Sequence, residues 1–102
     1  MSKDLYVSSL LDVYGSFLNK KQASVLDYYY NDDLSLSEIA ENEGITRQGV
    51  ADLIKRSVTQ LRTLEENCHY CESFLKLKEL KDRALNGDTD SIKEIYEIID
   101  NL

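Results

Sequence analysis

The fold is decided by Leu34–Lys55, LSLSEIAENEGITRQGVADLIK. Its spacing is that of a helix-turn-helix, in which a tight turn joins two short helices. Ser35 and Glu38 are placed to form a capping box at the start of the first helix. Gly44 stands at the turn, which needs a positive φ, and Thr46 is placed to cap the second helix. The stretch therefore predicts two helices that meet at Gly44.

The apolar residues of this stretch agree with the same template. Ile39 begins the apolar face of the first helix, and Ala40 stands where the two helices approach most closely. A larger side chain at Ala40 would separate them. Ile45 is expected to fill the space under the turn. Val50 and Leu53, three residues apart, are expected to bury the inner face of the second helix.

Composition extends the helical prediction to the whole chain. The 102 residues include no proline and only four glycines, and the 42% that are hydrophobic recur at helical spacing. We therefore expect an all-α protein with one domain, or with one small domain and an appendage. No apolar run approaches the ~20 residues of a membrane span, and the first residues lack the apolar core of a signal peptide. The cytoplasm is the expected compartment.

Helices are also predicted on both sides of the motif. The first covers Leu5–Leu18, and a second runs from a cap at Asn19 to about Tyr30, before a turn at 31–33. After Thr46 the pattern allows one long helix or two helices with a bend near 67–69, and we favour the bend. A stop at 86–88 precedes a last helix at 91–101. The residues expected to face inward from these helices are Val7, Leu10, Leu11, Tyr14, Phe17, Leu18, Val25, Leu26, Tyr29, Ile92, Ile95, Tyr96 and Ile99. We divide the chain into a helix-turn-helix domain, 1–66, and an acidic C-terminal helical extension, 67–102.

Charge limits how strongly a single copy can bind nucleic acid. The formal net charge is −7, whereas residues 34–63 carry four basic and four acidic groups. Residues 64–102 carry five basic and ten acidic groups, which repel phosphate unless they point away from the groove. The motif's basic residues, Arg47, Lys55, Arg56 and Arg62, all lie on or after its second helix. Duplex binding is therefore compatible with the sequence, but tight binding by one copy is not expected.

Candidate contacts lie on the outward face of the second motif helix, since the N-terminal residues of a groove-reading helix contact bases. They are Thr46, Arg47, Gln48, Ala51, Asp52, Lys55 and Arg56. Arg47 is suited to guanine and Gln48 to adenine, each in a bidentate contact. Asp52 is unfavourable near phosphates, although a carboxylate can accept a hydrogen bond from cytosine. The alternative interpretation is a solvated face on a domain that contacts protein.

Other chemistry is weakly supported. Cys68 and Cys71 are spaced as a C-x-x-C pair, but a structural zinc needs four ligands and the chain has no second pair. Both thiols are expected to be small core residues, and no metal or cofactor is predicted. For the tyrosines, core packing is favoured over base stacking. Tyr28 and Tyr30 are the two whose side chains could be exposed to solvent. No nucleophile with a paired base stands out, so an enzyme is not expected.

An acidic, leucine-spaced segment from Leu61 to Leu80 is a candidate partner surface. Its apolar stripe exceeds what one surface helix of so small a domain needs to bury. We expect a homodimer through the C-terminal helices, because many helix-turn-helix proteins are two-fold dimers. The alternative is packing of this segment against the last helix of its own chain.

Three stretches resemble the YlxM family of small bacterial proteins: Leu18–Gln22, Tyr29–Glu41 and Thr46–Arg56. The helix-turn-helix of that family is similar to region four of sigma-70-type factors. The resemblance implies a sigma-70 region-four-like helix-turn-helix bundle, with Arg47, Gln48, Lys55 and Arg56 carried over as candidate contacts.

The family is described as DNA-binding, and its genes lie beside that of the signal recognition particle GTPase. The resemblance therefore implies a DNA-binding regulator that acts in the signal recognition particle pathway. The alternative is an accessory that binds the RNA or the GTPase of that particle without reading a DNA sequence. The helix-turn-helix alone does not indicate which of these ligands is bound.

Overall fold

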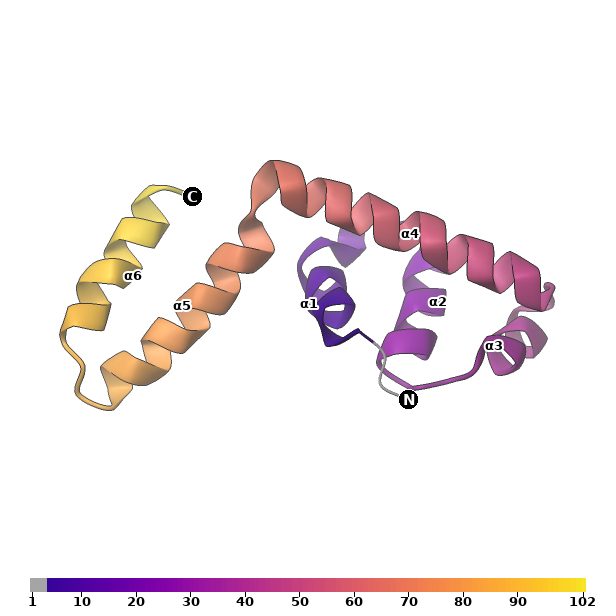
Figure 1. The fold of residues 1–102 in the computed structure, drawn as a ribbon, viewed down its shortest axis with the longest axis horizontal. Coiled ribbons are helices and arrows are strands. Elements are labelled where there is room, and N and C mark those ends of the chain that lie inside the picture. Colours follow the sequence, from indigo (N-terminus) through magenta and orange to yellow (C-terminus); the bar gives the residue numbers. More distant parts are fainter. Residues whose placement is uncertain (1–3) are drawn as a thin grey trace. The chain divides into compact units, whose positions relative to one another are not determined.

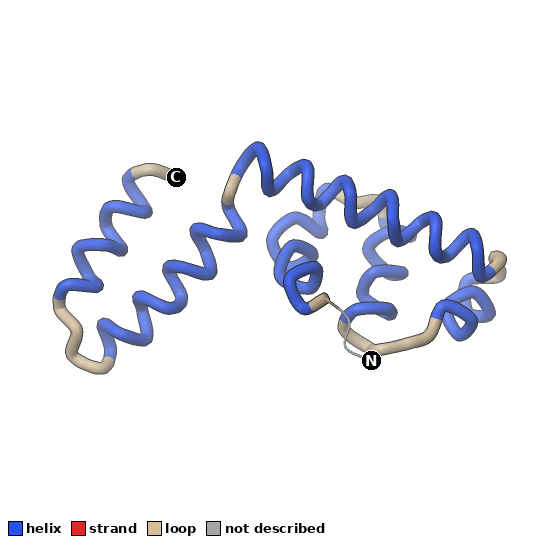
Figure 2. Tube along the Cα trace, in the orientation of Figure 1, coloured by secondary structure: helices blue, strands red, loops and turns tan. Residues whose placement is uncertain are grey.

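The computed structural model describes residues 4–102, and every regular element in that range is a helix, which confirms the all-α prediction (Figures 1 and 2). The chain divides into two compact units, Met1–Asn67 and Cys68–Leu102. None of the helices over residues 4–102 is long and apolar enough to cross a membrane.

The first unit is built from four α-helices and one short 3-10 helix. These are α1 (Leu5–Tyr14), η1 (Gly15–Phe17), α2 (Lys20–Tyr30), α3 (Leu36–Glu43) and α4 (Arg47–Cys68). In Figure 1, α4 extends along α1, α2 and α3. The core is formed by fully buried side chains from all four α-helices, among them Val7, Leu10, Tyr14, Val25, Leu26, Ile39, Val50 and Leu61.

The cap of α2 forms as the sequence predicts. The Asn19 side chain accepts a hydrogen bond from the Gln22 amide at 2.8 Å, and the Gln22 side chain accepts one from the Asn19 amide at 3.0 Å. Two orphan amides at the helix start are thereby satisfied. The predicted turn after Tyr30 is also confirmed, because Asp33 adopts a φ of 56° before α3 begins.

The first predicted helix ends earlier than expected. Helix α1 stops at Tyr14, and the chain continues as the 3-10 helix up to Phe17 instead of remaining α-helical to Leu18. A 3-10 helix has three residues per turn, so the α-helical spacing no longer predicts which side chains face inward. Phe17 is 65% exposed, contrary to the prediction, whereas Leu18 is buried.

The three tyrosines of α2 do not separate into buried and exposed side chains as predicted. Tyr29 was expected to face inward, but Tyr28, Tyr29 and Tyr30 are all half-buried. The rings of Tyr29 and Tyr30 meet edge to face with centroids 5.0 Å apart. Partial burial is the main cause that raises the pKa of Tyr30, and the neighbouring Tyr29 is the next largest. This geometry is typical of packing at the edge of a core.

A buried hydrogen bond joins α1 to α4. The Tyr14 hydroxyl donates to Glu65 Oε1 at 2.6 Å, and Glu65 is only 8% exposed. The neighbouring Leu64 is only half-buried, whereas the carboxylate of Glu65 is buried. A charge-assisted hydrogen bond offsets part of the cost of removing that carboxylate from water.

Tyr14→Phe is therefore expected to lower the free energy of unfolding by about 1–3 kcal/mol, because Glu65 loses a hydrogen bond in a buried place. Urea unfolding followed by circular dichroism measures the change. The control is Tyr28→Phe, which removes a hydroxyl from a half-buried tyrosine of the same unit that takes no part in this bond and should change little. Equal effects of the two substitutions would show that the buried bond adds nothing to stability.

The second unit is a pair of helices, α5 (Tyr70–Leu85) and α6 (Asp90–Asp100), which pack against each other. His69, with a φ of 59°, interrupts the helical chain between α4 and α5, so the predicted break near 67–69 is confirmed. Cys71 is buried as expected, but Cys68 is exposed. The prediction of two core thiols is wrong for Cys68 because it is the last residue of α4, immediately before the break.

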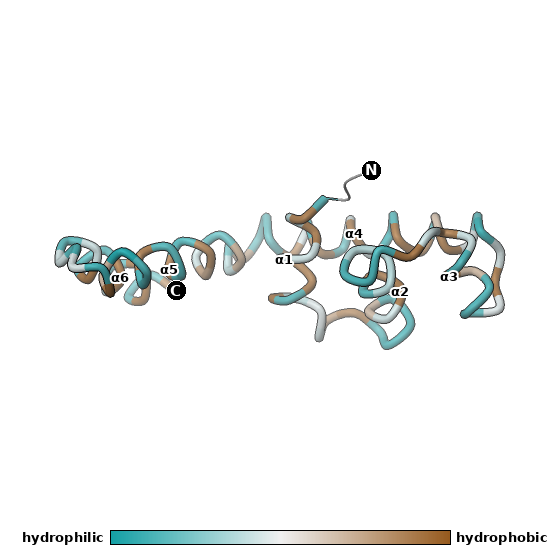
Figure 3. The backbone as a smooth tube through the Cα atoms, turned by 90° about the horizontal axis from the view of Figure 1, so that it is seen from below, coloured by the Kyte–Doolittle hydropathy of each residue, from teal (hydrophilic) through white to brown (hydrophobic). Residues whose placement is uncertain are grey.

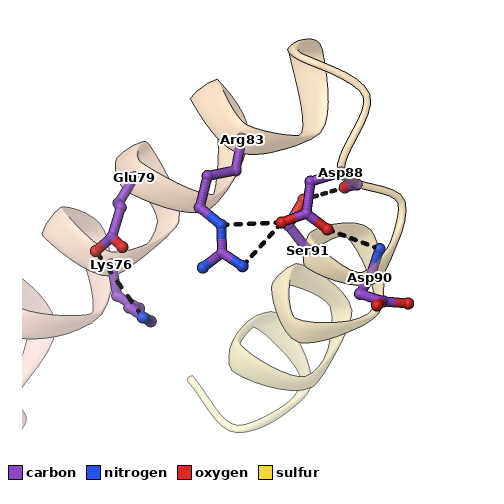
Figure 4. A network of polar contacts seen from close by, with 6 residues as sticks. All are labelled: Lys76, Glu79, Arg83, Asp88, Asp90 and Ser91. Atoms are coloured by element: carbon purple, nitrogen blue, oxygen red, sulfur yellow. Dashed lines mark hydrogen bonds and ion pairs between the residues drawn. The ribbon is translucent and has the colours of Figure 1, made fainter.

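The turn between α5 and α6 is held by Asp88 (Figure 4). Arg83 donates to its carboxylate from Nε at 3.0 Å and from Nη2 at 2.8 Å. The Asp90 amide donates to the other oxygen of Asp88 at 3.2 Å, and the Ser91 hydroxyl donates to the Asp88 carbonyl. The hydrogen bonds from Arg83 lower the pKa of Asp88. Asp88, and not the side chain of Thr89, thus accepts the hydrogen bond at the start of α6.

Candidate nucleic-acid interface

The turn of the motif has the predicted geometry. Gly44 ends α3 with a φ of 67°, and both its own amide and that of Ile45 donate to the Ala40 carbonyl. A Cβ added at Gly44 would meet nothing within 4 Å. Glycine is therefore required here by backbone conformation and not by lack of space.

Gly44→Ala is expected to destabilise the protein by about 1 kcal/mol, because alanine is strained at positive φ. Gly15→Ala is the matched control, since Gly15 has a φ of −55° and a Cβ there would make an ordinary contact of 3.4 Å with Leu11. Thermal unfolding of both variants measures the difference. A drop in melting temperature as large for Gly15→Ala would contradict the conformational explanation.

Both motif helices begin with the predicted caps. Ser35 Oγ accepts from the Glu38 amide at 3.1 Å, and the Glu38 side chain accepts from the Ser35 amide at 3.0 Å. At the start of α4, Thr46 Oγ1 accepts from the Gly49 amide at 2.9 Å. A Cβ at Gly49 would lie 3.1 Å from that same oxygen, so glycine leaves room for the cap. The first turn of α4 is thereby fixed for whatever it contacts.

The inner face of α4 differs from the prediction at one residue. Val50 is fully buried as expected, but Leu53 is half-buried and Ile54 is buried instead. At 3.6 residues per turn, Val50, Ile54, Ser57 and Leu61 lie closer to one line than Leu53 does. The Ser57 hydroxyl donates to the Leu53 carbonyl at 2.7 Å, so this fully buried serine leaves no unsatisfied polar group.

The outer face of α4 presents almost all of the predicted contact residues. Exposed there are Thr46, Arg47, Gln48, Asp52, Lys55 and Arg56. Ala51 is half-buried, so it offers only part of its methyl group to a ligand. The accessibility required of a groove-reading helix is therefore present along its first three turns.

Three of these residues are linked through Asp52. Gln48 Nε2 donates to Asp52 Oδ1 at 3.0 Å, which joins side chains one helical turn apart. Arg56 Nε lies 3.5 Å from the Asp52 carbonyl oxygen. The sequence predicted these residues as separate contacts and did not predict that they bond to one another.

Thr59 was not predicted as part of this surface. It lines an open hollow of about 670 Å³ together with Asp52, Lys55 and Arg56, and its hydroxyl donates to the Lys55 carbonyl at 2.9 Å. Its position three and four residues after Arg56 and Lys55 is the sequence signal that would have found it. Because its only proton is donated to the Lys55 carbonyl, Thr59 helps to line the hollow but offers no free donor to a phosphate.

Arg62 is less available than the other basic residues of α4. Its guanidinium lies 3.4 Å from the carboxylate of Asp4, and both side chains are about half exposed, at 54% and 47%. An ion pair at this exposure contributes little to stability, but it offsets part of the arginine's charge. The net positive surface of α4 is thus carried by Arg47, Lys55 and Arg56.

A capped helix pair, a left-handed glycine turn and an exposed second helix define a helix-turn-helix protein. The family model described as "Putative helix-turn-helix protein, YlxM / p13 like" matches residues 1–102. The chain belongs to this family, which confirms the predicted membership.

Three bacterial relatives align with nearly the whole of this chain. A UPF0122 protein of Clostridium acetobutylicum is 42% identical over 107 residues, covering 100% of this chain and 92% of the relative. One from Clostridium kluyveri is 39% identical over 107 residues, covering 100% and 93%. One from Acetivibrio thermocellus is 46% identical over 98 residues, covering 96% and 78%.

Proposed function

We propose that the protein is a DNA-binding regulator whose helix α4 enters the major groove of a duplex. The observation that carries this proposal is the exposed first turn of α4, where Arg47 and Gln48 follow directly after the Thr46 cap. Arginine and glutamine are the side chains suited to guanine and adenine in bidentate contacts. Lys55 and Arg56, two turns further on, are placed for phosphate contacts that fix the register.

The charge balance limits how steeply this binding can depend on salt concentration. The four basic residues of 34–63 are matched by four acidic ones, so few phosphates are neutralised per copy. Each neutralised phosphate contributes about −0.9 to the slope of log affinity against log salt. A shallow slope and modest affinity are expected for one copy, and a second copy on an adjacent half-site would add to both.

We infer that two copies of the protein dimerise through their second units, Cys68–Leu102. The 35 residues of this unit fully bury only Cys71, Leu80 and Ser91, fewer than a unit of this size needs for independent stability. The side chains of α6 that the sequence predicted on one face are largely exposed: Ile92 by 43%, Tyr96 by 65% and Ile99 by 50%. Apolar positions recur along both helices in Figure 3.

Charge favours a second copy as the occupant of this face. Helix α5 carries four basic and three acidic residues, whereas α6 carries one basic and four acidic. If α5 of one protomer lies beside α6 of its partner in a two-fold four-helix bundle, opposite net charges meet. The exposed apolar face of α6 then becomes the bundle core.

A second candidate function is that of an accessory in the signal recognition particle pathway. The acidity of residues 64–102, with ten acidic against five basic groups, favours a protein over a nucleic-acid ligand for that part of the chain. Under this alternative the RNA or the GTPase of the particle is the partner, and α4 reads no DNA sequence.

Gel shifts at matched salt distinguish the two functions. Duplex DNA of random sequence and signal recognition particle RNA are each titrated with wild-type protein and with Arg47→Glu/Lys55→Glu. The proposal predicts a duplex shift that the double charge reversal abolishes. A GTPase pull-down that survives this reversal, but is lost on truncation after Arg62, would support the accessory function instead.

A further inference from the structure

We propose that Asp52 determines specificity by orienting the Gln48 amide and by weakening binding to unmatched sequences. The inference rests on the proposed function, because it concerns how α4 would read a duplex. Its basis is the hydrogen bond of 3.0 Å from Gln48 Nε2 to Asp52 Oδ1, between two exposed side chains on the outer face of α4.

The donor and acceptor inventory of glutamine explains the orienting role. The amide has two N–H donors and one carbonyl oxygen. When one N–H bonds to Asp52, the other N–H and Oε1 of Gln48 remain for a ligand. Adenine in the major groove offers the complementary pair, an acceptor at N7 and a donor at N6. A carboxylate can only accept, so Asp52 fixes which end of the amide is nitrogen and prevents the flipped pose.

Asp52 also has an electrostatic effect that a simple phosphate-binding surface would not need. It lines the same hollow as Lys55 and Arg56, the two cations placed for phosphate contacts. Its negative charge there weakens attraction to every duplex, whatever the sequence. A group that lowers general affinity while orienting a base-reading side chain raises the ratio of specific to non-specific binding.

Two substitutions separate these effects. Asp52→Asn removes the charge and keeps an oxygen that can accept from Gln48, although its N–H groups can also donate to Gln48 Oε1 in the flipped pose. Asp52→Ala removes both the charge and the acceptor. Each is tested with Gln48→Ala as a background, using the duplex enriched from a random pool, copies of it with single adenines replaced, and an unrelated duplex of equal length. The readouts are affinity for the unrelated duplex and discrimination between enriched and substituted duplexes.

Both variants are expected to bind the unrelated duplex more tightly, by about threefold to tenfold at low salt, because one repulsive charge is lost near the phosphates. Asp52→Ala should lose about tenfold in discrimination at one adenine, and Asp52→Asn should lose less, because its oxygen still accepts from Gln48 in one of its two amide orientations. In the Asp52→Ala background, adding Gln48→Ala should cause no further loss of discrimination at that adenine. Loss of discrimination to the same degree in Asp52→Asn would overturn the orienting role. Unchanged non-specific affinity in both would overturn the electrostatic one.

Nuclear magnetic resonance of the free protein tests the hydrogen bond without nucleic acid. The side-chain amide of Gln48 should shift and lose order in Asp52→Ala but shift less in Asp52→Asn. An amide unaffected by Asp52→Ala would contradict the inference even if the protein binds DNA. Failure of wild-type protein to bind any duplex while the amide responds would instead overturn the proposed function, and the specificity role with it.

Discussion

Arg47→Ala is expected to weaken binding to the enriched duplex by about tenfold to a hundredfold, the range of one bidentate base contact. Arg47 is the exposed first residue of α4, whose first turn is fixed by the Thr46 cap. The proposal assigns it to a base because the N-terminal residues of a recognition helix contact bases. Binding to an unrelated duplex should fall far less, because only a charge is lost there. Fluorescence anisotropy at fixed salt measures both affinities.

Lys55→Ala is the matched control for this prediction. Lys55 is exposed on the same helix, two turns further along, and is proposed to contact phosphate. Its loss should lower affinity for all duplexes by a similar factor and reduce the salt slope by about one. If Arg47→Ala and Lys55→Ala behave alike on both duplexes, Arg47 is a phosphate contact and not a base reader.

The double variant Tyr96→Asp/Ile99→Asp is expected to convert the protein into a monomer. Both side chains are at least half exposed in a single chain, at 65% and 50%, so their replacement should leave the fold of that chain intact. In the two-fold bundle both side chains would be buried in each of the two protomers. Burying one such side chain contributes about 1.5–3 kcal/mol, so placing four carboxylates in that core should raise the dissociation constant by more than about a thousandfold.

Light scattering after size-exclusion chromatography measures this prediction. Wild-type protein should have twice the chain mass of 11.7 kDa, and the double variant should have 11.7 kDa. Phe17→Asp is the matched control, since Phe17 is also 65% exposed but belongs to the first unit. It should remain dimeric. A wild-type protein that is monomeric at tens of micromolar would overturn the dimer.

Local rules predicted the parts of the fold that depend on neighbouring residues alone. The capping box at Ser35 and the left-handed turn at Gly44 each follow from residues within a few positions. The break at His69 was favoured over one long helix but had no such local signal. Periodicity was less reliable, because it identifies residues that share a face and not what covers that face. Ile92, Tyr96 and Ile99 do share one face of α6, yet nothing in their spacing indicates that a single chain leaves them exposed.

The misses have both long-range and local causes. Burial of Glu65 depends on Tyr14, which lies 51 residues earlier in the chain, and no local pattern connects the two. The change from α-helix to 3-10 helix after Tyr14 likewise reversed the expected burial of Phe17. In the candidate site, exposure was predicted well. The pairing of Gln48 with Asp52 was not, although four-residue spacing makes it available on any helix.

Selection from a pool of random duplexes at low salt tests the central claim most directly. Wild-type protein should enrich one motif, arranged as two half-sites about one helical turn apart, and Arg47→Ala should fail to enrich it. If repeated rounds with wild-type protein recover no sequence above the starting pool, α4 does not read duplex DNA and the proposed function is wrong.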